Sequence, residues 1–169
     1  MVIVGVDPGS LCTGYGVIAA ENARIRWLDA GVIKAPRSKE LSVRLLKLHD
    51  GLLGVVQRWS PDAIAMEECF MGRYARAALV LGHARGALMI AALTERVPLF
   101  EYAPRLVKMA STGAGSASKE QVQAMVPHLI EGAPQGLLPD EADALAVAVC
   151  HVHRMVPVTH IAAVGEVLR

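Results

Sequence analysis

The chain has 169 residues, 53% of them hydrophobic and 20% charged, and its formal net charge is +1 at pH 7. This length suits one domain with a sizeable core, and the composition excludes a disordered chain. The uninterrupted apolar run at 86–93 is far shorter than the roughly 18 residues of a membrane span, and Asp7 interrupts the stretch that most resembles a secretion signal. Three cysteines at no metal-ligand spacing favour free thiols in a reducing compartment. We therefore expect a soluble, cytoplasmic protein with no membrane partner.

The first third of the chain predicts a strand-rich start followed by a helix. Short apolar runs bounded by turn residues predict strands over 2–6, 14–20 and 24–34, and their short links favour an antiparallel meander. Leucines at helical spacing then predict an amphipathic helix over 38–59.

The remainder alternates strands and helices. "PDAIAMEE" predicts a short buried strand that ends at Glu67, and a second such strand is predicted over 98–102. Helices are predicted over 73–96, 104–111, 119–131 and 140–155. Three antiparallel strands followed by two parallel steps describe a five-stranded mixed α/β sheet flanked by helices, which gathers ligand groups at strand carboxyl ends. We expect one domain over 1–155 and assign nothing to the tail, 156–169.

Four acids stand at positions that such a sheet brings together. Asp7 and Glu67 each end an apolar strand, while Asp140 and Asp143 are three residues apart and share one helix face. Each has an ordinary explanation when taken alone. Asp7 precedes Pro-Gly and suits a turn, and Asp140 can cap its helix with Asp143 in a capping-box position.

Taken together, the four acids favour a metal site. No lysine lies beside them in sequence, and clustered carboxylates suit Mg²⁺ or Mn²⁺, with the remaining ligands supplied by water or phosphate oxygens. Two such ions about 4 Å apart can clamp the attacking and leaving oxygens of a phosphodiester. The alternative, an acid/base pair as in glycosidases, needs two carboxylates and leaves two unexplained.

Six motifs, in order, resemble the RuvC family of bacterial Holliday-junction resolvases, and the match is collinear from residue 2 to about 154. They are "DPGSLCTGYG" from residue 7, "AMEECF" around 67, "LGHARG" at 81–86, "FEYAPRLVK" at 100–108, "GSASKEQV" at 115–122 and "DEADALAVA" at 140–148.

The resemblance implies an RNase H-like fold and a homodimer that resolves four-way DNA junctions in homologous recombination and DNA repair. It further implies paired Mg²⁺-dependent nicks in two strands of like polarity, two ions per active site with Mn²⁺ as a substitute, and RuvA and RuvB as partners. A preference for thymine-containing cleavage sites is a prediction of the same kind.

The resemblance also assigns site residues. The metal-binding acids are Asp7, Glu67, Asp140 and Asp143. Lys108 and Lys119 are the lysines near the scissile phosphate, and both flank a Gly/Ser-rich loop from which they can reach a phosphate.

Residues that follow Glu67 are candidates for DNA contact. Phe70 matches the family's aromatic residue that stacks on a base near the junction centre. Arg73, Tyr74 and Arg76 follow it and form a basic and aromatic cluster suited to backbone contact and stacking. The small residues along the helix at 75–86 permit close helix approach, either within the molecule or between two copies.

Other functions remain to be weighed. A phosphate-binding loop of the helicase type is not present in "GAGSASKE", and the second Gly-rich hairpin of actin-like sugar kinases is not found. An RNase H-like nuclease that acts on RNA and a non-catalytic junction-binding protein stay open as alternatives. Cys150, His151 and His153 are too close along a helix to share a zinc ion. Glu68 and Glu141 are extra acids whose roles the sequence does not give.

Overall fold

The computed structural model describes residues 1–22, 24–37, 39–68 and 74–155. Its sheet has five strands in the order β3-β2-β1-β4-β5. β1–β2 and β2–β3 are antiparallel, whereas β1–β4 and β4–β5 are parallel. The predicted mixed sheet is therefore confirmed. The elements are β1 Val2–Asp7, β2 Cys12–Glu21, β3 Arg24–Lys34, α1 Leu41–Trp59, β4 Ala63–Glu67, α2 Ala75–Thr94, β5 Leu99–Tyr102, α3 Pro104–Thr112, α4 Lys119–Leu129 and α5 Pro139–Arg154.

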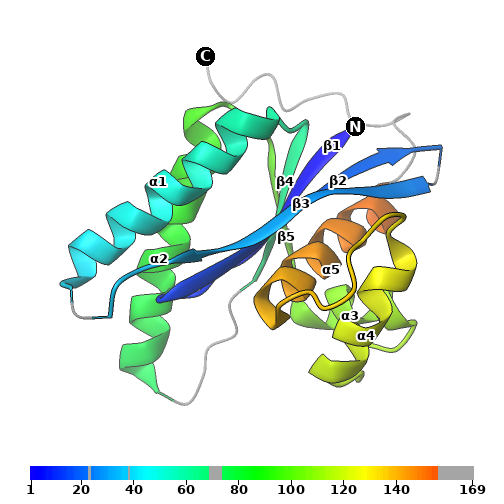
Figure 1. The fold of residues 1–169 in the computed structure, drawn as a ribbon. Helices are drawn as coiled ribbons and strands as arrows, with labels where there is room; N and C mark the ends of the chain where they lie inside the picture. The colour runs from blue at the N-terminus through cyan, green and yellow to red at the C-terminus, as the bar shows by residue number, and fades with distance from the viewer. Residues whose placement is uncertain (23, 38, 69–73, 156–169) are drawn as a thin grey trace.

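Helices cover both faces of the sheet. α1 and α2 lie against one face, and α3, α4 and α5 lie on the other (Figure 1). Alternate strand residues supply the two cores: Val4 and Val6 of β1 pack towards α1 and α2, whereas Ile3 packs towards α5. Because β1 is central and buried on both faces, its carboxyl end is held rigidly.

Several helix boundaries differ from the sequence prediction by a few residues, and one of the differences has an identifiable cause. The first helix begins at Leu41 rather than at 38. α4 ends at Leu129 rather than at 131, because Ile130 leaves the helix in an extended conformation and Glu131 pairs with β3. The Glu131 N–H donates to Ile25 O (2.8 Å), and the Trp27 N–H donates to Glu131 O (2.9 Å). This short parallel pairing adds a strand-like segment to the outer edge of β3.

α2 is unusually apolar for a helix that covers a sheet. By length and composition alone it could cross a bilayer, because its mean hydropathy is 1.5. In the structure, 22% of that stretch is buried. Ala84, Leu88 and Ala91 face the core, so the opposite side of the helix presents apolar residues to the surface.

Candidate active site

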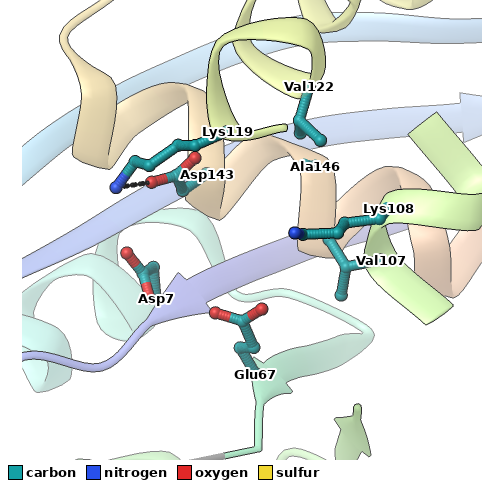
Figure 2. Close-up of a pocket in the computed structure, with 8 residues that line it drawn as sticks. All are labelled: Asp7, Glu67, Val107, Lys108, Lys119, Val122, Asp143 and Ala146. Carbon is teal, nitrogen blue, oxygen red and sulfur yellow. Dashed lines mark ion pairs between the residues drawn. The ribbon is translucent and has the colours of Figure 1, made fainter. Parts of the chain in front are cut away.

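Parallel pairing of β1 and β4 places the first two acids side by side. Val6 pairs with Met66, and the next residue along each strand is Asp7 or Glu67. Both strands end there, so the two carboxylates lie at the carboxyl edge of the sheet and point into one pocket (Figure 2). This is the arrangement that the two apolar runs predict.

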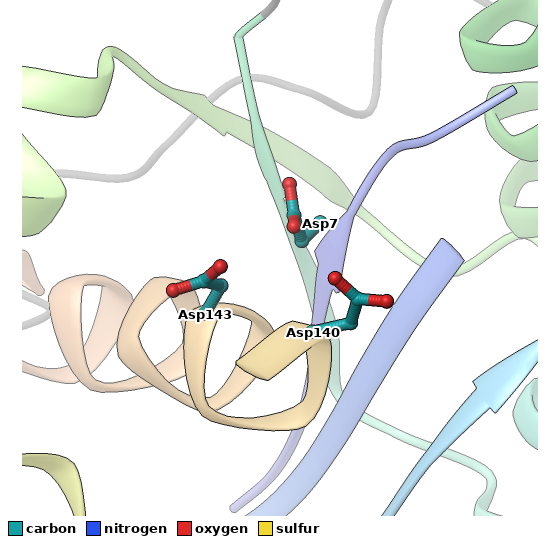
Figure 3. A group of neighbouring side chains, drawn as sticks. All are labelled: Asp7, Asp140 and Asp143. Carbon is teal, nitrogen blue, oxygen red and sulfur yellow. The ribbon is translucent and has the colours of Figure 1, made fainter. Parts of the chain in front are cut away.

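The first turn of α5 supplies the other two acids. Asp140 and Asp143 project from one side of the helix towards Asp7 (Figure 3), and one carboxylate oxygen from each of the three residues lies within 4.8 Å of the others. The capping explanation for Asp140 is wrong. The N-cap of α5 is Leu138, because Pro139 starts the helix.

Glu141 performs the capping task instead. Its Oε2 accepts a hydrogen bond of 2.8 Å from the Leu138 N–H, the reach-back bond of a capping box. The extra acid therefore has a structural partner outside the carboxylate cluster. Glu68, the other extra acid, is exposed, and its backbone N–H donates to Tyr102 O.

Glycines let α5 lie directly on the sheet. A Cβ on Gly14, which pairs with Asp7, would overlap the carbonyl oxygen of Asp140. A Cβ on Gly5 would overlap the carbonyl oxygen of Ala144 one turn later. These glycines set the separation between the first turn of α5 and Asp7. Their role depends on a tertiary contact, which the sequence pattern does not reveal.

Burial and like charge alter the protonation of the two strand-end acids. Burial first, and then the charge of Glu67, raise the pKa of Asp7 from 3.8 to about 7. Burial also raises the pKa of Glu67, although a hydrogen bond from Asp7 opposes the change. One proton shared by the pair relieves this repulsion, and so does a cation.

Two lysines line the same pocket. The Nζ of Lys119 lies 2.5 Å from Oδ2 of Asp143 (Figure 2), and this bond raises the pKa of Lys119. Lys119 opens α4, whose start is fixed by a capping box between Ser118 and Gln121. Lys108 projects from α3 towards Glu67 and has no ion-pair partner within the described residues.

One further contact to this site was not predicted. Gln123 Nε2 donates to Oδ1 of Asp143 at 3.4 Å, so Lys119 and Gln123, one helical turn apart, hold the two oxygens of that carboxylate. The four-residue spacing to Lys119 is the signal that places Gln123 on the same face.

The donor set fits hard divalent cations. All the candidate ligands are carboxylate oxygens, and burial together with the neighbouring carboxylates raises the pKa of Asp7. Oxygen-only sites of this kind suit Mg²⁺ or Mn²⁺. Among the described residues, Asp7, Asp140 and Asp143 are the acids, histidines or cysteines whose ligand atoms lie close enough together to hold a metal ion.

Two of the four predicted DNA-contact residues, Tyr74 and Arg76, lie in the described part of the chain. Tyr74, the N-cap of α2, is 78% exposed, and Arg76, the second residue of the helix, is also exposed. Phe70 and Arg73 lie outside the described residues. His151, which the sequence spacing sets aside as a zinc ligand, is buried, and its Nδ1 shares a hydrogen bond of 2.7 Å with the Tyr102 hydroxyl.

The fold and its acids define a class. A mixed five-stranded sheet with carboxylates at the ends of β1 and β4, faced by the acidic start of a helix, is an RNase H-like nuclease architecture. The family model for crossover junction endodeoxyribonuclease RuvC matches residues 3–151. The chain belongs to the RuvC family of crossover junction endodeoxyribonucleases.

Individual relatives agree with this assignment. The RuvC of Legionella pneumophila strain Philadelphia 1 is 44% identical over 154 residues, which cover 90% of this chain and 87% of the relative. The RuvC of Vibrio cholerae serotype O1 strain M66-2 has the same identity and coverage.

Solved structures agree as well. T. thermophilus RuvC in complex with Holliday junction substrate has a TM-score of 0.83 at 36% identity, and the match covers 90% of this chain and 93% of that one. The yeast mitochondrial Holliday junction resolvase Ydc2 has a TM-score of 0.63 at 15% identity, with 88% and 76% covered, which shows the shared fold. The predicted family and enzyme class are confirmed.

Proposed function

We propose that this protein resolves four-way DNA junctions by Mg²⁺-dependent phosphodiester hydrolysis, with Asp7, Glu67, Asp140 and Asp143 as the metal-binding acids. The carboxylate cluster of Asp7, Asp140 and Asp143, with Glu67 in the same pocket, is the observation that carries the proposal. These acids would hold two Mg²⁺ ions, or Mn²⁺ in their place, and the bound ions would supply the chemistry of water activation and of leaving-oxygen stabilisation.

Each side chain has a task that follows from its position. Asp7 lies between Glu67 and the two acids of α5, so it would hold metal together with both, and its carboxyl must lose its proton to do so. Lys108 and Lys119 can donate to the phosphate and stabilise the charge that develops on it. Gln123 holds the carboxylate of Asp143 in place.

Two findings support a junction as the substrate. The chain belongs to the RuvC family, and a similar solved structure is T. thermophilus RuvC in complex with Holliday junction substrate. Tyr74 and Arg76 are exposed at the start of α2, and we assign them to DNA contact together with Phe70 and Arg73. Paired nicks in strands of like polarity need two active sites and therefore a dimer.

The substrate is tested by comparing a four-way junction, a linear duplex and an RNA–DNA hybrid, each with and without Mg²⁺ after chelation. We expect nicking of the junction that requires added Mg²⁺, and at least about 100-fold slower nicking of the other two substrates. Faster cutting of the hybrid would favour the RNA-directed alternative. Tight junction binding without cleavage at any Mg²⁺ concentration would favour a binding protein.

The outer face of α2 supports the homodimer proposal. Leu79 is 62% exposed, Ile90 61% and Leu93 55%, and all three lie on one helical stripe. A Cβ on Gly82 or Gly86 would meet nothing within 4 Å, so packing inside the molecule does not require those glycines. Small residues between exposed apolar ones suit close contact with a second copy of the helix.

The dimer is tested with the double substitution Leu79→Glu and Ile90→Glu. We expect sedimentation equilibrium at micromolar concentration to give about half the mass of the parent protein, because two charges would have to be buried in the interface. Leu46→Glu on α1 is the matched control, since Leu46 is also 61% exposed. An equal effect of both changes would contradict an α2 interface.

Three further proposals follow from family membership. We propose a nuclease domain over 1–155 in a cytoplasmic protein that acts with RuvA and RuvB. Recovery of the chain with a RuvA–RuvB complex assembled on a junction tests the partnership. Its absence from that assembly would contradict it.

A further inference from the structure

Positive charge is concentrated in a short part of this nearly neutral chain. Residues 34–47 contain five lysines and arginines and one acid, whereas the whole chain has a net charge of +1. Three of these cations, Lys34, Arg37 and Lys39, lie between the end of β3 and the start of α1, and we call them the β3-end basic group.

The sheet places this group at the same edge as the acid cluster. Asp7 pairs with Gly14 of β2, and Cys12 of the same strand pairs with Lys34. The chain stays there beyond the strand, because the Ala35 N–H donates to Leu11 O at 2.8 Å. Val32 is level with Asp7, two inter-strand spacings of about 4.8 Å away, and Lys34 lies two residues further on, so Lys34 is about 12 Å from Asp7.

The order of the strands puts the two sets of cations on opposite sides of the acids. Lys108 follows β5 at one margin of the sheet, and the β3-end basic group follows β3 at the other, with the acid-bearing ends of β1 and β4 between them. A polyanion that crosses the carboxyl edge of the sheet would therefore meet cations before and after the carboxylates.

The basic group is available for a ligand. Lys34, Arg37 and Lys39 are all exposed, and none has an ion-pair partner in the described part of the chain. Arg58, Arg85 and Lys119, by contrast, are paired with acids. Glu40 is the acid that accompanies the group, and it also has no cation partner among these residues.

We propose that Lys34, Arg37 and Lys39 form a second phosphate-binding surface, which holds a duplex arm of the DNA on the β3 side of the acid cluster. The proposal rests on the function proposed above, because it takes the scissile phosphate to lie at Asp7. Phosphates follow one another at about 3.4 Å of helix axis per strand, so a distance of about 12 Å corresponds to roughly three to four nucleotides from the cut.

Such a surface has a measurable signature. Each phosphate contact releases counterions and contributes about 0.9 to the slope of log affinity against log salt concentration. Contacts with phosphates carry no sequence information, so the surface sets affinity and orientation and leaves cleavage-site preference unchanged.

The test compares two double substitutions that remove equal charge from opposite ends of the sheet. Lys34→Ala with Arg37→Ala removes two members of the basic group, and Arg24→Ala with Arg26→Ala removes two exposed cations near the β2–β3 hairpin. Both are made in an Asp7→Asn protein, so that a fluorescent four-way junction stays intact while anisotropy measures affinity from 50 to 300 mM salt.

We expect Lys34→Ala with Arg37→Ala to weaken junction binding about tenfold and to reduce the salt slope by roughly 2. The Arg24→Ala, Arg26→Ala pair should leave the slope unchanged. The swap Lys34→Arg with Arg37→Lys keeps the charge and should restore the parent slope, which separates loss of contact from misfolding.

The proposed phosphate-binding surface would be wrong if the two alanine pairs gave the same salt slope, whether both slopes fell or neither did. An unchanged junction affinity would reject DNA as the ligand, including the case in which the group binds an acidic protein instead. If the Asp7→Asn parent failed to bind the junction at all, the proposed function and this surface would fail together. That result differs from binding by the parent with no effect of the variants.

Discussion

The Asp7→Asn protein is expected to bind a four-way junction as the parent protein does and to cut it at least about 10³-fold more slowly. Asp7 is the central carboxylate, with Glu67 on one side and the two acids of α5 on the other. A neutral amide keeps the shape but removes the charge that would hold two cations. Single-turnover cleavage at saturating Mg²⁺ measures the loss, and junction binding with unchanged cleavage would contradict the catalytic assignment.

The same substitution should change the pH dependence of stability when a chelator is present. The pKa of Asp7 is about 7 in the folded protein, above its ordinary 3.8. An acid with a raised pKa contributes stability that is fully present below about pH 4 and is lost as the pH rises through about 7. We therefore expect the parent Tm in chelator to fall between these pH values and the Asp7→Asn Tm to fall less.

Glu68→Gln is the matched control for both measurements. Glu68 is an exposed acid that directly follows Glu67 but lies outside the carboxylate cluster. Its neutralisation should leave cleavage within about threefold of the parent and should leave the slope of Tm against pH unchanged. A similar fall in cleavage with Glu68→Gln would show that general loss of negative charge, and not the cluster, explains the first result.

Gly14→Ala is expected to lower both stability and activity. The added methyl would overlap the backbone carbonyl of Asp140, and a backbone atom cannot rotate away as a flexible side chain can. Overpacking of this kind costs about 1–3 kcal/mol of unfolding free energy. Because α5 must lift from the sheet, Asp140 and Asp143 move away from Asp7, and cleavage should fall about tenfold or more even where the protein remains folded.

Urea unfolding and cleavage assays at saturating Mg²⁺ check this expectation. The matched control is Gly54→Ala within α1, where a Cβ would meet nothing within 4 Å and the higher helix propensity of alanine should add up to about 1 kcal/mol. If the two substitutions had the same effect, the close approach of α5 to Gly14 would not govern the site.

The fold and the positions of the acids could be predicted because strong local patterns specify them. The buried apolar runs that end at Asp7 and Glu67 give two strands their length and their last residue, and parallel pairing then places both acids at one edge. The three-residue spacing of Asp140 and Asp143 fixes their shared helix face in the same way.

Other features depend on contacts between distant segments, which local patterns do not contain. The sequence allows Asp140 as the N-cap of α5, but Pro139 starts the helix and the N-cap is Leu138. Glu141 rather than Asp143 therefore supplies the reach-back hydrogen bond. The sequence predicts that α4 continues to 131, but the helix ends at Leu129 because the backbone of Glu131 bonds to β3. The closeness of Gly14 to Asp140 is likewise visible only when helix and sheet are packed together.

The pairing of Glu131 with β3 also affects how the molecule avoids aggregation. An outer strand with unpaired backbone groups is a template for strands of other molecules, and natural sheets shorten or cover such edges. Glu131 satisfies backbone groups of Ile25 and Trp27 at one margin, while β5 at the other margin is four residues long. Edge-to-edge growth of the sheet is thereby discouraged at both margins.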